Sequence, residues 1–334
     1  MQKILIVTDN LSDQVNGVVT TFKNIEKHAL ADGYEIVYLN PEFFKYIDCP
    51  GYPEVKLSWP RDIGGIIADI NPDHIHIATE GPIGAAASIH CWSNRLTYNT
   101  SYHTKFPEML KSNYGIPTGI TYAYMRWFHK HSGRVLTTTQ SMVNDLKSHG
   151  LTGDIITWTR GVDRTYLKPT ANRQYRNEGA RPVVLYTGRV SLEKNIDALC
   201  ELHELYDIRI VGDGPDKNRL KEKYPGVQFL GYRKGSDLAN CYATADVFAF
   251  PSRSDTFGLV IIEALSTGTP CAAYPVTGPI DIIESGVTGF LHQDLSVAIN
   301  RCLELDRDLV QKSSMKWTWE NCWKIFKNNL LPIR

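Results

Sequence analysis

Two cations, Arg189 and Lys194, occur five positions apart in the segment Gly188–Asn195 (GRVSLEKN). This segment directly follows Val183–Tyr186, which is short, apolar and typical of a buried strand. Open α/β sheets bind ligands beyond the carboxyl ends of their strands, and a guanidinium with an ammonium suits the charge of a diphosphate. A solvated basic loop is the alternative. The position after a strand favours an anion site with Arg189 and Lys194 as its cations.

The segment Pro251–Leu265 (PSRSDTFGLVIIEAL) combines a polar turn with two carboxylates. We expect a helix to begin near Thr256, with Asp255 as its N-cap. The N–H groups of its first turn, up to Leu259, would form a second anion site. Glu263 follows Asp255 by about 12 Å along a helix axis, so the two carboxylates fit the two ends of one extended ligand. N-capping alone would explain Asp255, whereas Glu263 lies among apolar residues and needs a specific partner.

Two further candidates follow predicted strands of the N-terminal half. Gly17 ends a polar loop after the strand Lys3–Val7 and precedes a helix expected from about Val19. A glycine there lets backbone approach a ligand, and the helix N-terminus offers N–H groups to an anion. His103 lies in the sequence SYHTKFP, just past another strand. A plain loop around Gly17 and a structural role for His103 are the alternatives.

A metal site is not expected. Asp306-Arg307-Asp308 is the only Asp-x-Asp sequence in the chain. It falls in a polar, predicted helical stretch far from the strand ends, and a solvated helix face is the better interpretation.

Strand-like and helix-like segments alternate along both halves of the chain, which predicts parallel, doubly wound sheets. The strand-like segments are Lys3–Val7, Tyr34–Leu39, His74–Ala78, Leu96–Tyr102, Arg134–Thr138, Val183–Tyr186, Ile208–Val211, Val227–Leu230, Val247–Phe250 and Pro270–Ala273. A polar stretch, residues 169–182, is predicted to be a linker. We therefore expect one domain over residues 1–168 and another over residues 183–314. Residues 315–334 carry an aromatic-rich amphipathic helix that must pack on a domain.

The composition argues against several functions. Lys plus Arg and Asp plus Glu both number 36 in 334 residues, so the net charge is zero and no global grip on nucleic acid is expected. No apolar run reaches the roughly 18 residues that span a bilayer. The seven cysteines have no CxxC spacing, which argues against a disulfide framework and for a reducing cytoplasm.

These segments together resemble the retaining nucleotide-sugar glycosyltransferases of the GT-B fold, in the large family 4-like group that includes bacterial α-mannosyl- and α-glucosyltransferases. The resemblance covers nearly the whole chain. Its motifs are NGVVTTF, CPGYPEVKLSWP, ATEGPIG, SYHTKFPEML and RGVD in the N-terminal half, and TGRVSLEKN, IVGDGP, FLGY, PSRSDTFGLVIIEAL and GPIDIIESGVTGF in the C-terminal half. The ordered set is specific. One departure concerns the donor sugar: the family usually has Glu where this chain has Asp255.

The resemblance implies two Rossmann-like domains facing a cleft, with the tail helix crossing back onto the first. A GDP- or UDP-hexose would bind mainly to the second domain. The resemblance implies that the diphosphate contacts Gly17, Arg189, Lys194 and the backbone of Thr256, Phe257, Gly258 and Leu259. Glu263 would contact the ribose, and Asp255 and His103 would contact the transferred sugar. Gly212 and Tyr232 would lie at the base region.

The implied reaction moves a mannose- or glucose-type hexose to a hydroxyl group of a glycan or glycolipid. Retaining glycosidases use two carboxylates about 5 Å apart, and the sequence offers no such pair. The resemblance instead implies front-face transfer, in which the leaving diphosphate takes the acceptor's proton while Arg189 and Lys194 stabilise its charge. Neither a metal nor another cofactor would be required.

Two other functions stay open: an epimerase or phosphorylase on a similar fold, and a non-catalytic nucleotide-sugar-binding module. Only an epimerase would interconvert sugars without an acceptor. The acceptor itself is also open. An apolar stripe with basic neighbours, between Ile120 and His131, fits a helix on the inner membrane surface, but a helix packed on its own sheet is favoured because any core helix shows such a stripe.

Overall fold

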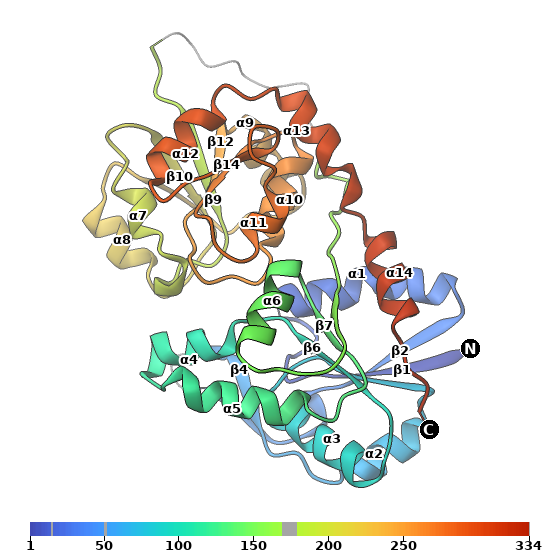
Figure 1. Ribbon diagram of the computed structural model, residues 1–334. Helices are drawn as coiled ribbons and strands as arrows, with labels where there is room; N and C mark the ends of the chain where they lie inside the picture. Colours follow the sequence, from blue (N-terminus) through green and yellow to red (C-terminus); the bar gives the residue numbers. More distant parts are fainter. Residues whose placement is uncertain (15, 50–51, 169–178, 334) are drawn as a thin grey trace. The chain divides into compact units, whose positions relative to one another are not determined.

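The computed structural model describes residues 1–14, 16–49, 52–168 and 179–333. The chain divides into two compact units: unit 1 comprises Met1–Arg160 and Trp319–Arg334, and unit 2 comprises Gly161–Thr318. Each unit is built on one six-stranded sheet flanked by helices (Figure 1). The prediction of two doubly wound α/β units is confirmed.

The sheet of unit 1 has the strand order β2-β1-β5-β6-β7-β8, and its paired neighbours are parallel. Its strands are β1 Gln2–Val7, β2 Tyr34–Leu39, β5 His74–Ile77, β6 Asn99–Tyr102, β7 Val135–Thr137 and β8 Ile155–Thr157. A separate antiparallel hairpin consists of β3 Tyr46–Cys49 and β4 Tyr52–Ser58. The helices are α1 Gly17–Ala31, η1 Pro41–Phe43, α2 Ile63–Ile70, α3 Pro82–Ser93, α4 Phe106–Tyr114, α5 Thr118–His129, α6 Gln140–Ser148 and α14 Trp319–Asn328.

The two faces of this sheet carry different helices. Ile75 and Ile77 of β5 pack in a core that also takes residues from α2, α3 and α5. His76 lies between them and therefore points to the opposite face, where its ring is 4.9 Å from that of Phe326 in α14. Phe22 of α1 packs edge-on against the same Phe326. Helices α1 and α14 thus lie side by side on this face (Figure 1).

The sheet of unit 2 has the strand order β11-β10-β9-β12-β13-β14, again parallel throughout its paired neighbours. Its strands are β9 Val183–Thr187, β10 Asp207–Val211, β11 Gln228–Gly231, β12 Val247–Phe250, β13 Cys271–Ala273 and β14 Gly289–Leu291. Its helices are η2 Leu192–Lys194, α7 Asp197–Cys200, α8 Lys217–Lys223, α9 Gly235–Thr244, α10 Leu259–Ser266, α11 Pro279–Ile282, α12 Leu295–Cys302, α13 Arg307–Ser313 and η3 Ser314–Lys316.

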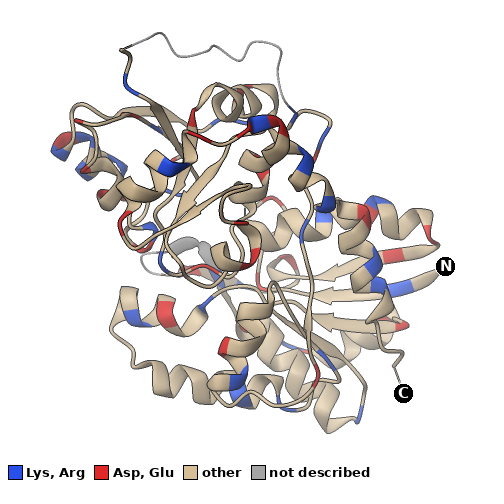
Figure 2. Cartoon of the chain, turned by 45° about the horizontal axis from the view of Figure 1, so that its top comes forward, with Lys and Arg blue, Asp and Glu red and all other residues tan. Residues whose placement is uncertain are grey.

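Alternate residues of β9 enter two separate cores. Val184 and Tyr186 pack with α7, α8 and α12 on one face. Leu185 packs with α9, α10 and α13 on the other. Both faces are therefore covered, which explains why these strands read as nearly continuous apolar runs. Figure 2 shows Lys and Arg interspersed with Asp and Glu on the elements of each unit.

The boundaries of the units differ from those expected. Residues 161–168 belong to unit 2 rather than to the first domain, because Val162 and Leu167 are buried in the core beneath α10. At the other end, Trp317 stays with unit 2, its ring packing edge-on against Phe257 at 5.6 Å. Only Trp319 and the residues after it join unit 1. Most of the predicted linker, residues 169–178, lies outside the described residues.

The tail helix packs on unit 1, as predicted. Trp158 donates from Nε1 to the carbonyl oxygen of Cys322 at 3.0 Å, and Trp323 donates from Nε1 to Asp32 at 2.8 Å. The sequence did not predict the hairpin or strands β8 and β14. Strands β8 and β14 have only three residues each.

Candidate functional site

The strand order of unit 2 reverses at β9 and β12. The chain proceeds outward from β9 to β10 and β11 on one side, and from β12 to β13 and β14 on the other. The loops that follow β9 and β12 therefore diverge from neighbouring strand ends. Such a switch point is where open α/β sheets bind ligands, and it is flanked here by the two segments with the candidate cations and carboxylates.

Lys194 and Asp255 connect these two loops. Lys194 Nζ lies 2.6 Å from Asp255 Oδ2, and both side chains are mostly buried. Burial alone would lower the pKa of Lys194, but the charge and hydrogen bond of Asp255 outweigh it and raise that pKa. The neighbouring Asn195, in the left-handed conformation, donates from Nδ2 to the carbonyl oxygen of Pro251 at 3.0 Å. Lys194 is thus held as a cation at the strand ends.

Arg189 lies earlier in the loop after β9. Its Nε is 4.0 Å from Glu193 Oε1, which also accepts a 2.6 Å hydrogen bond from Ser191. Its carbonyl oxygen accepts from the hydroxyl of the buried Tyr186 at 2.9 Å. The backbone of Arg189 is therefore fixed to the sheet, and its partly exposed guanidinium is carried next to the switch point.

The start of α10 differs from the prediction. The helix begins at Leu259, and its N-cap is Gly258 with φ of 94°, so Asp255 is not the N-cap. A glycine fits there because side-chain-bearing residues rarely adopt this conformation. Thr256 and Phe257 belong to the preceding loop, and Thr256 N donates to Asp255 Oδ1 at 3.2 Å. Of the four predicted N–H donors, from Thr256 to Leu259, only that of Leu259 belongs to the first helical turn.

Glu263 has the specific partner that its apolar surroundings require. Its Oε2 accepts a 2.8 Å hydrogen bond from the hydroxyl of Tyr242 in α9. Since that hydroxyl has one proton, the 2.5 Å contact between Tyr242 and Thr187 has Thr187 as the donor. Burial raises the pKa of Glu263, and the hydrogen bond from Tyr242 opposes this rise. Tyr242 was not predicted, because sequence spacing does not show which side chain on another helix meets Glu263.

Gly212 and Tyr232 follow the next two strands. A Cβ on Gly212, whose φ is 136°, would lie 1.9 Å from the carbonyl oxygen of Gly188. Gly212 therefore lets the turns after β9 and β10 approach each other, which is a structural reason for a glycine. Tyr232 follows β11 directly and is 56% exposed.

Gly17 is the first residue of α1, and it is exposed. The side chain of Asn16 caps the helix by accepting from Val18 N and Val19 N, both at 3.0 Å. Two of the N–H groups that we expected to be available to an anion, those of Val18 and Val19, are thus already hydrogen-bonded. Their pairing limits what this helix end can offer a ligand.

Asp9 lies at the reversal of strand order in unit 1, between β1 and β5. It is 7% exposed, and its carboxylate accepts from the Thr79 hydroxyl at 2.7 Å and from Ile83 N at 2.8 Å, with Gly84 N at 3.3 Å. Burial raises the pKa of Asp9 to about 6, although these hydrogen bonds lower it. Asp9 was not among the residues that the sequence predicted for the site.

His103 follows β6 and is partly buried. Its Nδ1 is 2.8 Å from Arg160 Nη2, and its ring lies near those of Trp158 (5.6 Å) and Phe22 (6.3 Å). Burial, Arg160 and His76 hold the pKa of His103 well below its ordinary value. Arg160 was not predicted as a site residue, although it opens the RGVD motif.

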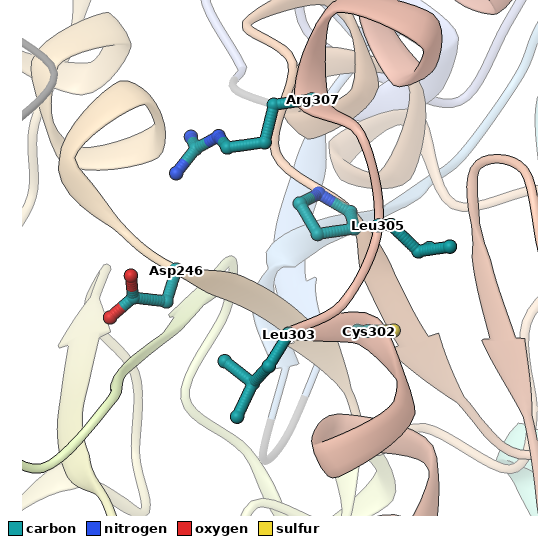
Figure 3. A pocket seen from close by; sticks show the side chains of 6 residues that line it. Asp246, Cys302, Leu303, Leu305 and Arg307 are labelled. Atoms are coloured by element: carbon teal, nitrogen blue, oxygen red, sulfur yellow. The ribbon is translucent and has the colours of Figure 1, made fainter. Parts of the chain in front are cut away.

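The Asp-x-Asp sequence has a structural role. Asp306 caps α13, accepting from Asp308 N at 2.8 Å. Arg307 donates to three backbone carbonyl oxygens, those of Ala243, Ala245 and Gly268. It lines a cavity of about 210 Å³ with Asp246 and Leu303 (Figure 3), at the opposite ends of the strands from Lys194. No cluster of His, Cys, Asp or Glu fit for a metal occurs in the described part of the chain.

The family comparisons cover both units. Residues 15–166 match the family described as Glycosyltransferase Family 4, and residues 181–305 match Glycosyl transferases group 1. A GDP-mannose-dependent alpha-mannosyltransferase of Mycobacterium tuberculosis is 30% identical over 325 residues, covering 86% of this chain and 83% of the relative. One from Corynebacterium glutamicum is 28% identical over 318 residues, covering 86% of this chain and 76% of the relative. Sulfoquinovosyl transferase SQD2 of Arabidopsis thaliana is 29% identical over 352 residues, covering 93% of this chain and 68% of the relative.

Solved structures agree on the fold. Sucrose-phosphate synthase from Thermosynechococcus elongatus superposes with a TM-score of 0.78 at 19% identity, covering 98% of both chains. HepE of Anabaena in complex with UDP-glucose gives a TM-score of 0.69 at 18% identity, covering 98% of this chain and 99% of that one. The chain therefore belongs to glycosyltransferase family 4, as a hexosyltransferase of the GT-B fold.

Proposed function

We propose that this glycosyltransferase moves a mannose- or glucose-type hexose from a nucleoside diphosphate sugar to a hydroxyl group of a glycan or glycolipid, with retention of configuration. The observation that carries the proposal is the pairing of Lys194 with Asp255 beside Arg189, at the switch point of unit 2. The names of the bacterial relatives, which are GDP-mannose-dependent, make GDP-mannose the first donor to test.

Each residue of unit 2 has a proposed place along the donor. Arg189 and Lys194 hold the diphosphate, together with the backbone from Thr256 to Leu259. Glu263, fixed by Tyr242, accepts from the ribose hydroxyls. Asp255 faces the transferred sugar. Gly212 and Tyr232 contact the base region.

Unit 1 supplies the acceptor side in this proposal. Gly17 approaches the diphosphate, and His103 lies beside the transferred sugar. As the bond to the sugar breaks, negative charge grows on the diphosphate, and the cations of unit 2 stabilise it more than they stabilise the bound substrate. The diphosphate oxygen then takes the proton of the attacking hydroxyl. The reaction needs no metal and no protein nucleophile.

Membrane contact is a separate part of the proposal. In α5 the side chains of Tyr122, Met125 and Phe128 are buried, which supports packing of this helix on its own sheet. Ile120 and Trp127 are 65% and 44% exposed. In the described residues no helix is long and apolar enough to cross a membrane. We infer that a lipid-linked acceptor would be met at a membrane surface. Co-sedimentation with liposomes, with and without anionic lipid, tests this contact.

The test of the function is donor turnover. Release of nucleoside diphosphate is measured from GDP-mannose and from UDP-glucose, with a panel of glycan and lipid acceptors and with no acceptor. We expect release that depends on an acceptor and a product that carries the sugar. Interconversion of the sugar without an acceptor would identify an epimerase. Binding without turnover across the panel would identify a non-catalytic module.

A further inference from the structure

Arg160 is a buried cation, and its hydrogen bonds within the described part of the chain go to neutral acceptors. It is 3% exposed. Nη1 donates to the carbonyl oxygens of Trp158 at 2.7 Å and Thr159 at 3.0 Å, and Nη2 approaches His103 Nδ1 at 2.8 Å. A buried guanidinium without a carboxylate partner is costly, and burial lowers the pKa of Arg160 to about 10.

The contact with His103 fixes a proton. A guanidinium has only donors, so His103 Nδ1 must be the acceptor in this pair. An accepting Nδ1 carries no hydrogen, and the proton of the neutral ring is therefore on Nε2. Burial and the charges of Arg160 and His76 keep the pKa of His103 well below its ordinary value, so the ring is neutral at pH 7.

The position of Arg160 is itself fixed. Its guanidinium lies 4.5 Å from the ring of Trp158. That ring packs against Phe326 of the tail helix at 4.8 Å and donates from Nε1 to Cys322 O at 3.0 Å. Helix α14 thus holds Trp158, Trp158 holds Arg160, and Arg160 holds the imidazole of His103.

We propose that Arg160 is a positioning residue that holds His103 as the Nε2–H tautomer, so that His103 meets the transferred sugar as a hydrogen-bond donor and not as a base. The part that concerns the sugar rests on the function proposed above. The charged group that faces His103 is Arg160, after β8. His76 on β5 also faces it, but burial lowers the pKa of His76 to about 3, so that ring is neutral between about pH 6 and pH 8. The rings of Phe22, on α1, and Trp158, after β8, carry no charge.

The first test reads the tautomer directly. Nitrogen-15 NMR of protein labelled at histidine is recorded between about pH 6 and pH 8, with the His103 signals assigned by comparison with His103→Gln. We expect an unprotonated Nδ1 and a protonated Nε2 throughout this range. A protonated Nδ1, or a charged imidazolium, would overturn the proposal whether or not the enzyme transfers sugar.

The second test is a double-mutant cycle on turnover. Arg160→Met and His103→Ala should each lower kcat about tenfold or more, and the double variant should be no slower than His103→Ala, because Arg160 acts through His103. Arg160→Lys, which restores a cationic donor, should recover part of the rate. If Arg160→Met slows the His103→Ala enzyme by the same factor as the wild type, Arg160 does not act through His103.

The matched control is Arg164→Met. Arg164, like Arg160, donates to a backbone carbonyl oxygen, that of Ser314 at 2.6 Å, but it is only partly buried and lies outside the proposed site. The Arg164→Met substitution should lower the melting temperature and leave kcat unchanged. A wild-type protein without transferase activity would count against the proposed function, while the NMR result would still decide the tautomer.

Discussion

Lys194 and Asp255 form a 2.6 Å ion pair that joins the loop after β9 to the loop after β12. The cation assigned to the diphosphate and the carboxylate assigned to the sugar are therefore direct neighbours. A diphosphate that binds Lys194 must share this cation with Asp255 or displace Asp255 from it. The ion pair therefore connects the residue assigned to the sugar with a residue assigned to the diphosphate. Glu263 has a separate partner, the hydroxyl of Tyr242.

Asp255→Asn and Glu263→Gln should fail differently. Asp255→Asn should act mainly on kcat, because the proposal places Asp255 at the transferred sugar, next to the cation that would hold the leaving diphosphate. Glu263→Gln should weaken binding of bare GDP or UDP as well, since Glu263 is placed at the ribose. Calorimetry with the bare nucleotides and steady-state kinetics with the donor measure both effects. If Asp255→Asn weakens nucleotide binding as much as Glu263→Gln does, the two-ended arrangement is wrong.

Tyr242→Phe should shift the pH dependence of nucleotide binding. In the proposed function the ribose hydroxyls donate to the charged form of Glu263, so binding should be lost as the pH falls through the pKa of Glu263. The hydrogen bond from Tyr242 lowers that pKa against the effect of burial. Without the hydroxyl the pKa rises, and binding should be lost from a higher pH than in the wild type. Tyr206→Phe, which removes a hydroxyl bound to Asn300 in the other core, is the control. Identical pH profiles for the wild type and Tyr242→Phe would contradict the assignment.

Asp9 should make the folded protein less stable as the pH rises. Its pKa is about 6 in the folded state, against an ordinary value of 3.8, so the folded state binds the proton more tightly. Between about pH 4 and about pH 6 this difference corresponds to a loss of about 3 kcal/mol in the free energy of unfolding. Asp9→Asn should abolish that slope, and Asp13→Asn, an exposed residue of the same loop, should keep it. Denaturant unfolding across this pH range measures both, and an unchanged slope in Asp9→Asn would rule out the buried carboxylate as its source.

Transfer should persist in excess chelator. In the proposed function Arg189, Lys194 and backbone N–H groups neutralise the leaving diphosphate, so no step of the proposed reaction requires a divalent cation. We expect most of the activity to remain in a chelator assay with the best donor. Complete loss that magnesium or manganese restores would show that the cations of the protein are not sufficient.

Much of the fold follows from the sequence because parallel strands buried on both faces are continuous apolar runs. Tyr34–Leu39 and Val247–Phe250 have the predicted bounds. The strand Ile155–Thr157 and the antiparallel pair Tyr46–Cys49 and Tyr52–Ser58 carry no comparable signal. The predicted start of α10 was wrong because Gly258, in the left-handed conformation, extends the loop before the helix. Residue type alone does not predict this backbone conformation.

The candidate site was predictable where strand ends bring loops together, and less so where single side chains meet across helices. Arg189, Lys194 and Asp255 lie at the switch point because of the strand order. The partners Tyr242 and Arg160 depend on how α9 and the turn after β8 pack, which local spacing does not encode.

The most direct test of the account is single-turnover transfer by Arg189→Ala, Lys194→Ala and the double variant, with melting temperatures as the control for folding. Removing a charged donor from such a site typically costs about 3 kcal/mol, a hundredfold in rate. Each single variant should lose about that much, and the double variant should lose far less than the product of the two losses, because the proposal assigns both cations to one leaving diphosphate. Near-wild-type rates in correctly folded single variants would contradict the diphosphate assignment and the transfer mechanism that depends on it.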